Sequence, residues 1–315
     1  MKKIYTMVGA LLTMALILSG CNNQTSTNDK IKIYATNFPY ESFAKQIGGK
    51  YVDANSIYPS GTDLHNYEPT QKEMLNIAKS DLFIYSSNEL DPVAKKISST
   101  IKSDDHKLEA VANLKESHIL EHHHEHGEEE EHEHEHEDEE SANDPHIWLD
   151  PIVNKEAAKS IKDKLVQKDP DHKEYYQKNY QNLIKDINEI DESLQNVTKD
   201  TKRDTVFISH DSLGYLANRY HFKQKGVTGM NNEEPTQKEI LEIIKDINNS
   251  KSPYILYEQN VSSKMTDIIK KDTKSKPLKF HNLEVLTKDE AKQKNISYQS
   301  LMEENIKTLD KALNK

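Results

Sequence analysis

EPTQKE occupies residues 68–73 of this chain and recurs at residues 234–239, 166 positions later. In both copies a Thr stands three residues before a Glu, which is the spacing of a capping box at the start of a helix. Each copy leads into an apolar-periodic run, and a strand-like string follows each run, LFIYSS (82–87) or YILYEQ (254–259). The repeat therefore predicts two equivalent halves that use the same helix start.

Strand-like segments alternate with helical segments through both halves, which predicts parallel sheets built from βαβ units. The expected strands are residues 31–36, 52–59, 82–87, 107–113, 205–210, 254–259 and 278–285. Between the halves, residues 171–199 contain no Gly or Pro and keep helical apolar spacing, so they predict one helix roughly 40 Å long. The expected fold is α/β, with two similar lobes, each a parallel sheet flanked by helices, joined by one long rigid helix.

The N-terminal thirty residues predict export and attachment to a membrane. Lys2 and Lys3 precede the apolar core MVGALLTMALIL, which is too short for a comfortable membrane span. LSGC at residues 18–21 resembles a bacterial lipobox and predicts a lipid on Cys21, the chain's only cysteine. We expect a signal peptide over 1–20, a flexible tether over 21–30, an N-terminal lobe over 31–168, a linker helix over 169–201 and a C-terminal lobe over 202–315.

The net charge of −11 comes from one loop and not from the fold. Residues 121–140 hold twelve of the 53 acidic residues, and without them 41 acidic residues face 42 basic ones. This balance excludes the basic surface that a nucleic-acid-binding protein needs. The expected disordered loop, 115–142, is rich in metal-capable side chains and predicts auxiliary zinc binding. Its histidines are His118, His122, His123, His124, His126, His132, His134 and His136.

Four metal-capable residues fall where predicted strands end or loops follow them, and this is where open parallel sheets bind ligands. His65 and His146 lie in the first half, and His210 and Glu284 lie in the second. Three imidazoles and one carboxylate suit tetrahedral zinc, whereas manganese favours more oxygen ligands. Glu258 also ends a predicted strand and is the rival of Glu284 for the fourth position.

DLHNYEPT (63–70), DPHIWLDP (144–151) and FISHDSLGYL (207–216), together with the lipobox and the His-rich loop, carry a resemblance over the whole chain. They resemble the zinc-specific solute-binding lipoproteins of bacterial ABC importers, the AdcA/ZnuA type. The resemblance implies Zn²⁺ between two lobes on His65, His146, His210 and Glu284. It also implies a lipid-anchored monomer on the outer face of the cell membrane that hands zinc to a permease with its ATPase. AdcA proteins commonly carry a further ZinT-like zinc domain, and this chain stops at residue 315.

Other function classes share parts of this pattern. A zinc hydrolase keeps three protein ligands and an open water position, whereas four protein ligands would close the site. No separate general base or nucleophile motif accompanies the histidines, so we expect no enzyme activity. A manganese-binding importer component or an adhesin would use the same fold.

Overall fold

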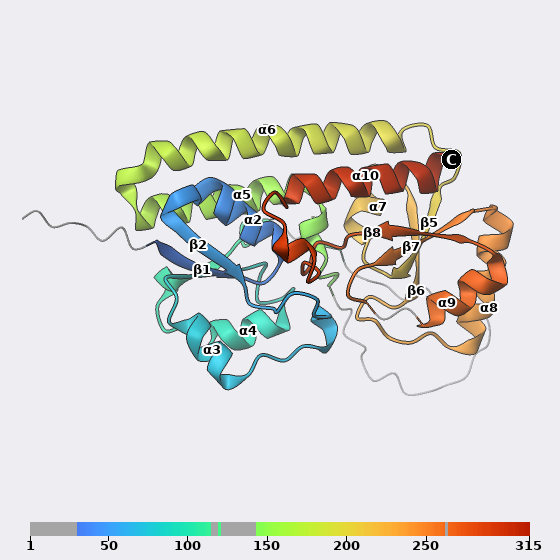
Figure 1. Cartoon of the computed structure of the whole chain (residues 1–315), viewed down its shortest axis with the longest axis horizontal. Helices are drawn as coiled ribbons and strands as arrows, with labels where there is room; N and C mark the ends of the chain where they lie inside the picture. Colours follow the sequence, from blue (N-terminus) through green and yellow to red (C-terminus); the bar gives the residue numbers. More distant parts are fainter. Residues whose placement is uncertain (1–29, 115–118, 121–142, 262–263) are drawn as a thin grey trace, which may run out of the picture. The chain divides into compact units, whose positions relative to one another are not determined.

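Two four-stranded parallel sheets carry the fold (Figure 1). The computed structural model describes residues 30–114, 119–120, 143–261 and 264–315. The first sheet has the order β2-β1-β3-β4 and the second the order β6-β5-β7-β8, so the two match strand for strand. The strands are β1 (Ile31–Ala35), β2 (Val52–Ser56), β3 (Leu82–Tyr85), β4 (Lys107–Glu109), β5 (Thr205–His210), β6 (Lys223–Thr228), β7 (Tyr254–Glu258) and β8 (Lys276–Phe280).

Several predictions fall outside the described residues. They are the signal peptide, the tether with Cys21, and all eight histidines of the acidic loop, from His118 to His136. Residues 31–315 form one compact unit. The boundaries expected for the lobes inside that unit stay a prediction.

One hydrophobic core continues from the first half into the second. It joins one face of both sheets to the helices that cover that face. These helices are α2 (Phe38–Gly48), α5 (Pro151–Lys168), α6 (Lys173–Thr198), α7 (Gly214–Tyr220) and α10 (Tyr298–Asn314). We call this the shared core.

The opposite face of each sheet has a small core of its own. In the first half, α3 (Gln71–Ala78) and α4 (Pro92–Ser98) cover side chains of β3 that point away from the shared core. In the second half, α8 (Gln237–Ser250) and α9 (Lys264–Thr273) do the same for β5 and β7. Alternate residues of a strand face opposite sides, so each sheet is covered on both faces.

The repeated hexapeptide forms the same cap twice. Thr70 accepts a hydrogen bond from the backbone of Glu73 at 3.3 Å, and the Glu73 carboxylate accepts one from the backbone of Thr70 at 2.7 Å. Thr236 and Glu239 repeat both bonds at the same two distances. The predicted capping boxes are confirmed, and each begins the helix that follows it, α3 or α8.

The long helix α6 spans 26 residues, after a short 3₁₀ turn over Pro170–His172. Its buried side chains are Tyr176, Leu183, Ile187, Ile190 and Leu194. With this stripe it packs against α2 and α5 of the first half and against α7 and α10 of the second (Figure 1). The helix therefore supports both halves along its length.

Several strand predictions need correction. The strands expected over 52–59 and 107–113 are β2 and β4, which end at Ser56 and Glu109. The strand expected over 278–285 is β8, which ends at Phe280, so the prediction that a strand runs to Glu284 is wrong. β6 was not predicted, because its residues KQKGVT carry little apolar signal. β6 is an edge strand with only its last two residues buried, so it needs few apolar side chains.

Replacing Ile187 with Ala tests the structural role of α6. The side chain is fully buried in the shared core, so its loss should lower the free energy of unfolding by about 2–5 kcal/mol. Urea denaturation followed by circular dichroism measures the change. Lys185→Ala, on the exposed side of the same helix, is the matched control and should shift stability by less than about 0.5 kcal/mol. Equal stability of the two variants would contradict the assigned role.

Candidate metal centre

His146 lies in the segment DPHIWLDP (residues 144–151), which leads into α5. The Asp144 carboxylate accepts hydrogen bonds from the His146 backbone at 2.9 Å and from its Nδ1 atom at 2.8 Å. The ring is fully buried. Because Nδ1 donates to Asp144, Nε2 is the ring nitrogen that can bind a metal once it has lost its proton. This pairing of a carboxylate with an imidazole is typical of metal-binding histidines.

His210 is the last residue of β5 and is oriented in the same way by Glu258, the last residue of the neighbouring strand β7. One Glu258 oxygen accepts from His210 Nδ1 at 2.5 Å and from Ser209 Oγ at 2.7 Å. The other accepts from Ser212 Oγ at 2.6 Å. Glu258 is thus occupied by His210 and two serines, and His210 presents its Nε2 atom.

Glu284 lies four residues beyond the end of β8, on a tightly held loop. The Trp148 indole donates to the backbone carbonyl of Asn282 at 2.9 Å. His281 Nδ1 accepts from the Leu283 backbone, and the carbonyls of Leu283 and Glu284 accept from the Phe38 backbone. Leu283 itself is fully buried and has a φ of 62°, a left-handed conformation that is unusual for leucine. These contacts hold the backbone that carries the Glu284 side chain.

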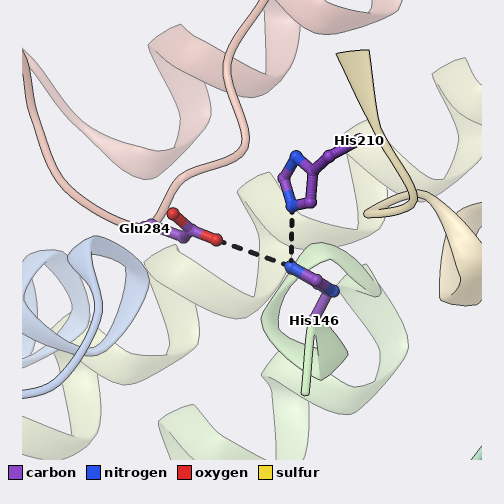
Figure 2. Close-up of side chains that lie close together, drawn as sticks. All are labelled: His146, His210 and Glu284. Atoms are coloured by element: carbon purple, nitrogen blue, oxygen red, sulfur yellow. Dashed lines mark hydrogen bonds and ion pairs between the residues drawn. The ribbon is translucent and has the colours of Figure 1, made fainter. Parts of the chain in front are cut away.

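His146, His210 and Glu284 converge on one buried point (Figure 2). The two Nε2 atoms lie 3.2 Å apart, and Glu284 Oε1 lies 3.5 Å from His146 Nε2. Two nitrogens bound to tetrahedral Zn²⁺ at 2.0–2.1 Å would lie about 3.3 Å apart. The donor atoms therefore already have the spacing that a zinc ion requires.

Buried carboxylates dominate the electrostatics of this cluster. Burial disfavours a charged ring, but the hydrogen bonds and charges of Asp144 and Glu284 outweigh it and raise the pKa of His146 to about 10. The pKa of His210 is also raised, because Glu258 outweighs the cost of burial. Burial alone would raise the pKa of Glu258. His210 and the two serines lower it by more, so the pKa of Glu258 lies below its usual value. The site thus favours positive charge at the ligand positions.

The outcome for the predicted ligands differs by residue. The structure brings together His146, His210 and Glu284. His65 lies in the 3₁₀ turn Leu64–Asn66, and its side chain is outside the described part of the chain. Glu258, the rival for the fourth position, orients His210 and is not in the cluster. The role of Asp144 was not predicted, although its place two residues before a predicted ligand could have indicated it.

Comparison with known proteins points to one family. Residues 33–312 match the family described as ZnuA, zinc-uptake complex component A, periplasmic. The chain is 30% identical over 308 residues to the high-affinity zinc uptake system protein ZnuA of Bacillus subtilis, covering 95% of this chain and 94% of that protein.

Two further relatives have the same fold. The zinc-binding lipoprotein AdcA of Streptococcus pneumoniae is 29% identical over 310 residues, and the match spans 98% of this chain but 60% of AdcA. Its Zn(II)-bound crystal structure superposes with a TM-score of 0.72 at 25% identity, covering 91% of this chain and 58% of that one. The laminin-binding protein Lmb of Streptococcus agalactiae gives a TM-score of 0.74 at 26% identity, covering 90% of this chain and all of that chain.

Glu284→Ala and Glu258→Ala should weaken zinc binding to different extents. Loss of Glu284 removes a donor atom from the cluster, whereas loss of Glu258 leaves the three donors but frees the His210 ring to turn. The Glu258 variant should therefore lose roughly 10- to 100-fold in affinity, and the Glu284 variant should lose more. Competition against a chelator of known zinc affinity measures both variants. If Glu284→Ala still bound zinc tightly and Glu258→Ala did not, the roles of the two residues would be reversed.

Zinc binding should release protons at neutral pH. The raised pKa of His146 keeps the metal-free ring protonated at pH 7, and a ring nitrogen that binds zinc must be unprotonated. We expect about one proton per zinc or more, and an affinity that falls as the pH falls from 8 to 6. Calorimetry in buffers of different ionisation enthalpy counts the protons. Heats that do not depend on the buffer would refute the expectation.

Proposed function

The chain belongs to the ZnuA family of zinc-uptake components, and on that premise we propose that it captures Zn²⁺ outside the cell membrane and delivers it to the permease of an ABC importer. The family consists of solute-binding transport proteins, so this chain is a zinc-binding transport component and not an enzyme. Zinc is accordingly the cargo of the protein and not a resident cofactor.

The observation that supports capture of zinc is the donor set of the buried cluster. Two imidazole nitrogens and a carboxylate oxygen, all from buried residues, favour zinc over the oxygen-seeking ions manganese and magnesium. We propose His65 as the fourth ligand, because its turn lies just before the capping box of α3 and its motif DLHNYEPT matches the resemblance. Four protein ligands would leave no position for a reactive water, which separates this site from that of a zinc hydrolase.

The location and the auxiliary loop belong to the same proposal. Lipid on Cys21 would hold the protein at the outer face of the membrane, and AdcA is itself described as a lipoprotein. Among the described residues, no helix is both long and apolar enough to cross a bilayer. The histidines between His118 and His136 would capture zinc weakly and pass it to the buried ligands. Lmb is described as both an adhesin and a metal transporter, and no feature of the residues that the structure describes favours adhesion.

Zinc-limited growth tests the proposal. Cells in which the native gene carries His210→Ala should fail to grow when zinc is chelated, because the variant lacks one imidazole donor, and added zinc but not manganese should rescue them. His221→Asn is the matched control: this exposed histidine has a φ of 58°, a conformation that Asn tolerates. Growth of the His210→Ala cells equal to that of the parent in chelated medium would refute the proposal.

A further inference from the structure

A buried asparagine, Asn282, contacts the segments on which the metal centre is built. It is fully buried, lies two residues before Glu284 and is not one of the clustered donors. Its backbone carbonyl accepts a hydrogen bond at 2.9 Å from the indole of Trp148, which lies two residues after His146. Its backbone N–H donates at 3.1 Å to the side chain of Gln259, which follows the last residue of β7. Asn282 therefore joins the loop of Glu284 to two other segments of the site.

The buried side chain of Gln259 forms a second hydrogen bond with Asn282. Backbone N–H groups can only donate, so those of Asn282 and Glu284 identify the amide oxygens that they contact. These oxygens are Gln259 Oε1, 3.1 Å from the Asn282 nitrogen, and Asn282 Oδ1, 3.2 Å from the Glu284 nitrogen. The other end of the Gln259 amide, Nε2, then donates to Asn282 Oδ1. Asn282 Oδ1 thus accepts from Gln259 and from Glu284 together.

Gln259 connects this asparagine to His210. It is the next residue in the chain after Glu258, whose carboxylate accepts from the His210 ring and orients it. The backbone of Glu284 is therefore tied, through Asn282 and Gln259, to the carboxylate that orients the ring. A displacement of Asn282 would move Glu284 relative to His210.

The asparagine side chain is costly at this place. Among the residues that the structure describes, its Nδ2 atom is buried without a hydrogen-bond partner, which lowers the stability of a folded protein. An aspartate would supply the same Oδ1 acceptor, but it would bury a second negative charge two residues from Glu284. Asparagine supplies the acceptor without that charge. The bonds of Oδ1 to Gln259 and Glu284 are therefore the contacts that account for this residue.

We propose that Asn282 is the positioning residue for the Glu284 ligand and holds its carboxylate beside the two imidazoles before zinc arrives. This inference rests on the proposed function, because it takes Glu284 as a zinc ligand. Asn282 contacts no ion and acts through the backbone of Glu284. Its loss would leave all three donor atoms in the chain, but the carboxylate would be free to move away from the rings. Zinc binding would then have to order the loop, at a cost in affinity.

Zinc affinities of single and double variants test this role. The full chain carries Asn282→Ala, Gln259→Met, Glu284→Ala, or Asn282→Ala together with Glu284→Ala, and each is measured by competition against a chelator of known zinc affinity. Asn282→Ala should weaken zinc binding roughly 10- to 100-fold, as the loss of an outer hydrogen-bonding partner does. Gln259→Met keeps a side chain of similar length without its hydrogen bonds and should weaken binding about tenfold. If Asn282 acts through Glu284, the double variant should bind zinc no more weakly than Glu284→Ala alone.

A control variant and a spectrum separate positioning from a general loss of stability. Ile187→Ala removes a buried side chain from the shared core and should leave zinc affinity unchanged. Cobalt(II) bound in place of zinc reports the number and geometry of its ligands through its visible absorption. Asn282→Ala and Gln259→Met should change that absorption spectrum, and Ile187→Ala should not.

Each outcome decides the question. Zinc affinity equal to that of the parent in both Asn282→Ala and Gln259→Met would overturn the positioning role and leave the proposed function intact. A double variant that binds zinc much more weakly than Glu284→Ala would also overturn it, because Asn282 would then act by another route. If circular dichroism shows that Asn282→Ala does not fold, Gln259→Met decides alone. A parent chain that binds no zinc would overturn the proposed function and this inference with it.

Discussion

Two imidazole rings buried with their Nε2 atoms 3.2 Å apart are the constraint on which this structure depends. Buried polar groups are costly unless each is hydrogen-bonded, and two rings that favour protonation repel each other. Asp144 and Glu258 offset this cost by accepting from the outer nitrogen of each ring. The same bonds fix which nitrogen points inward. The arrangement that makes the metal-free site tolerable therefore also prepares it for a cation.

Such a site requires that three segments from different parts of the chain keep their positions to within a fraction of an ångström. The shared core provides this, because α6 and α10 pack across both halves. Specific polar contacts reinforce it. Asp150 caps α5 in the first half and pairs with Arg219 of α7 in the second. Ser42 of α2 accepts from the backbone of Tyr298 at the start of α10.

The sequence predicted those parts of the fold that local chemistry determines. Capping boxes, the long Gly- and Pro-free helix and the strand ending at His210 all have signals within a few residues of themselves. β6 was missed because an edge strand needs few apolar residues, so KQKGVT lacks a strand pattern. The extent of β8 was mispredicted because the loop after it is also buried and carries Leu283 and Val285 at alternate positions, which imitates a strand.

The residues of the candidate site could also be predicted only in part, because some of their positions depend on contacts that are distant in the sequence. His146, His210 and Glu284 could be selected from their motifs, but the choice between Glu284 and Glu258 could not be made from strand ends alone. Glu258 does end a strand, but the neighbouring strand β5 places His210 beside it. The Glu258 carboxylate therefore accepts a hydrogen bond from the His210 ring. Glu284 reaches the cluster because its loop is turned by contacts to Trp148 and Phe38, which are distant in sequence.

The left-handed backbone of Leu283 has a consequence for the time that an ion stays bound. A bulky residue held in this conformation stores on the order of 1–3 kcal/mol, and here it stands directly before the carboxylate of Glu284. Relaxation of Leu283 to an ordinary conformation would swing that carboxylate and return the stored energy. If it is all recovered as the ligand detaches, the dissociation rate is roughly 5- to 150-fold faster than with a relaxed loop. Zinc held on Glu284, as we propose, would therefore have a shorter residence time than zinc held on a relaxed loop.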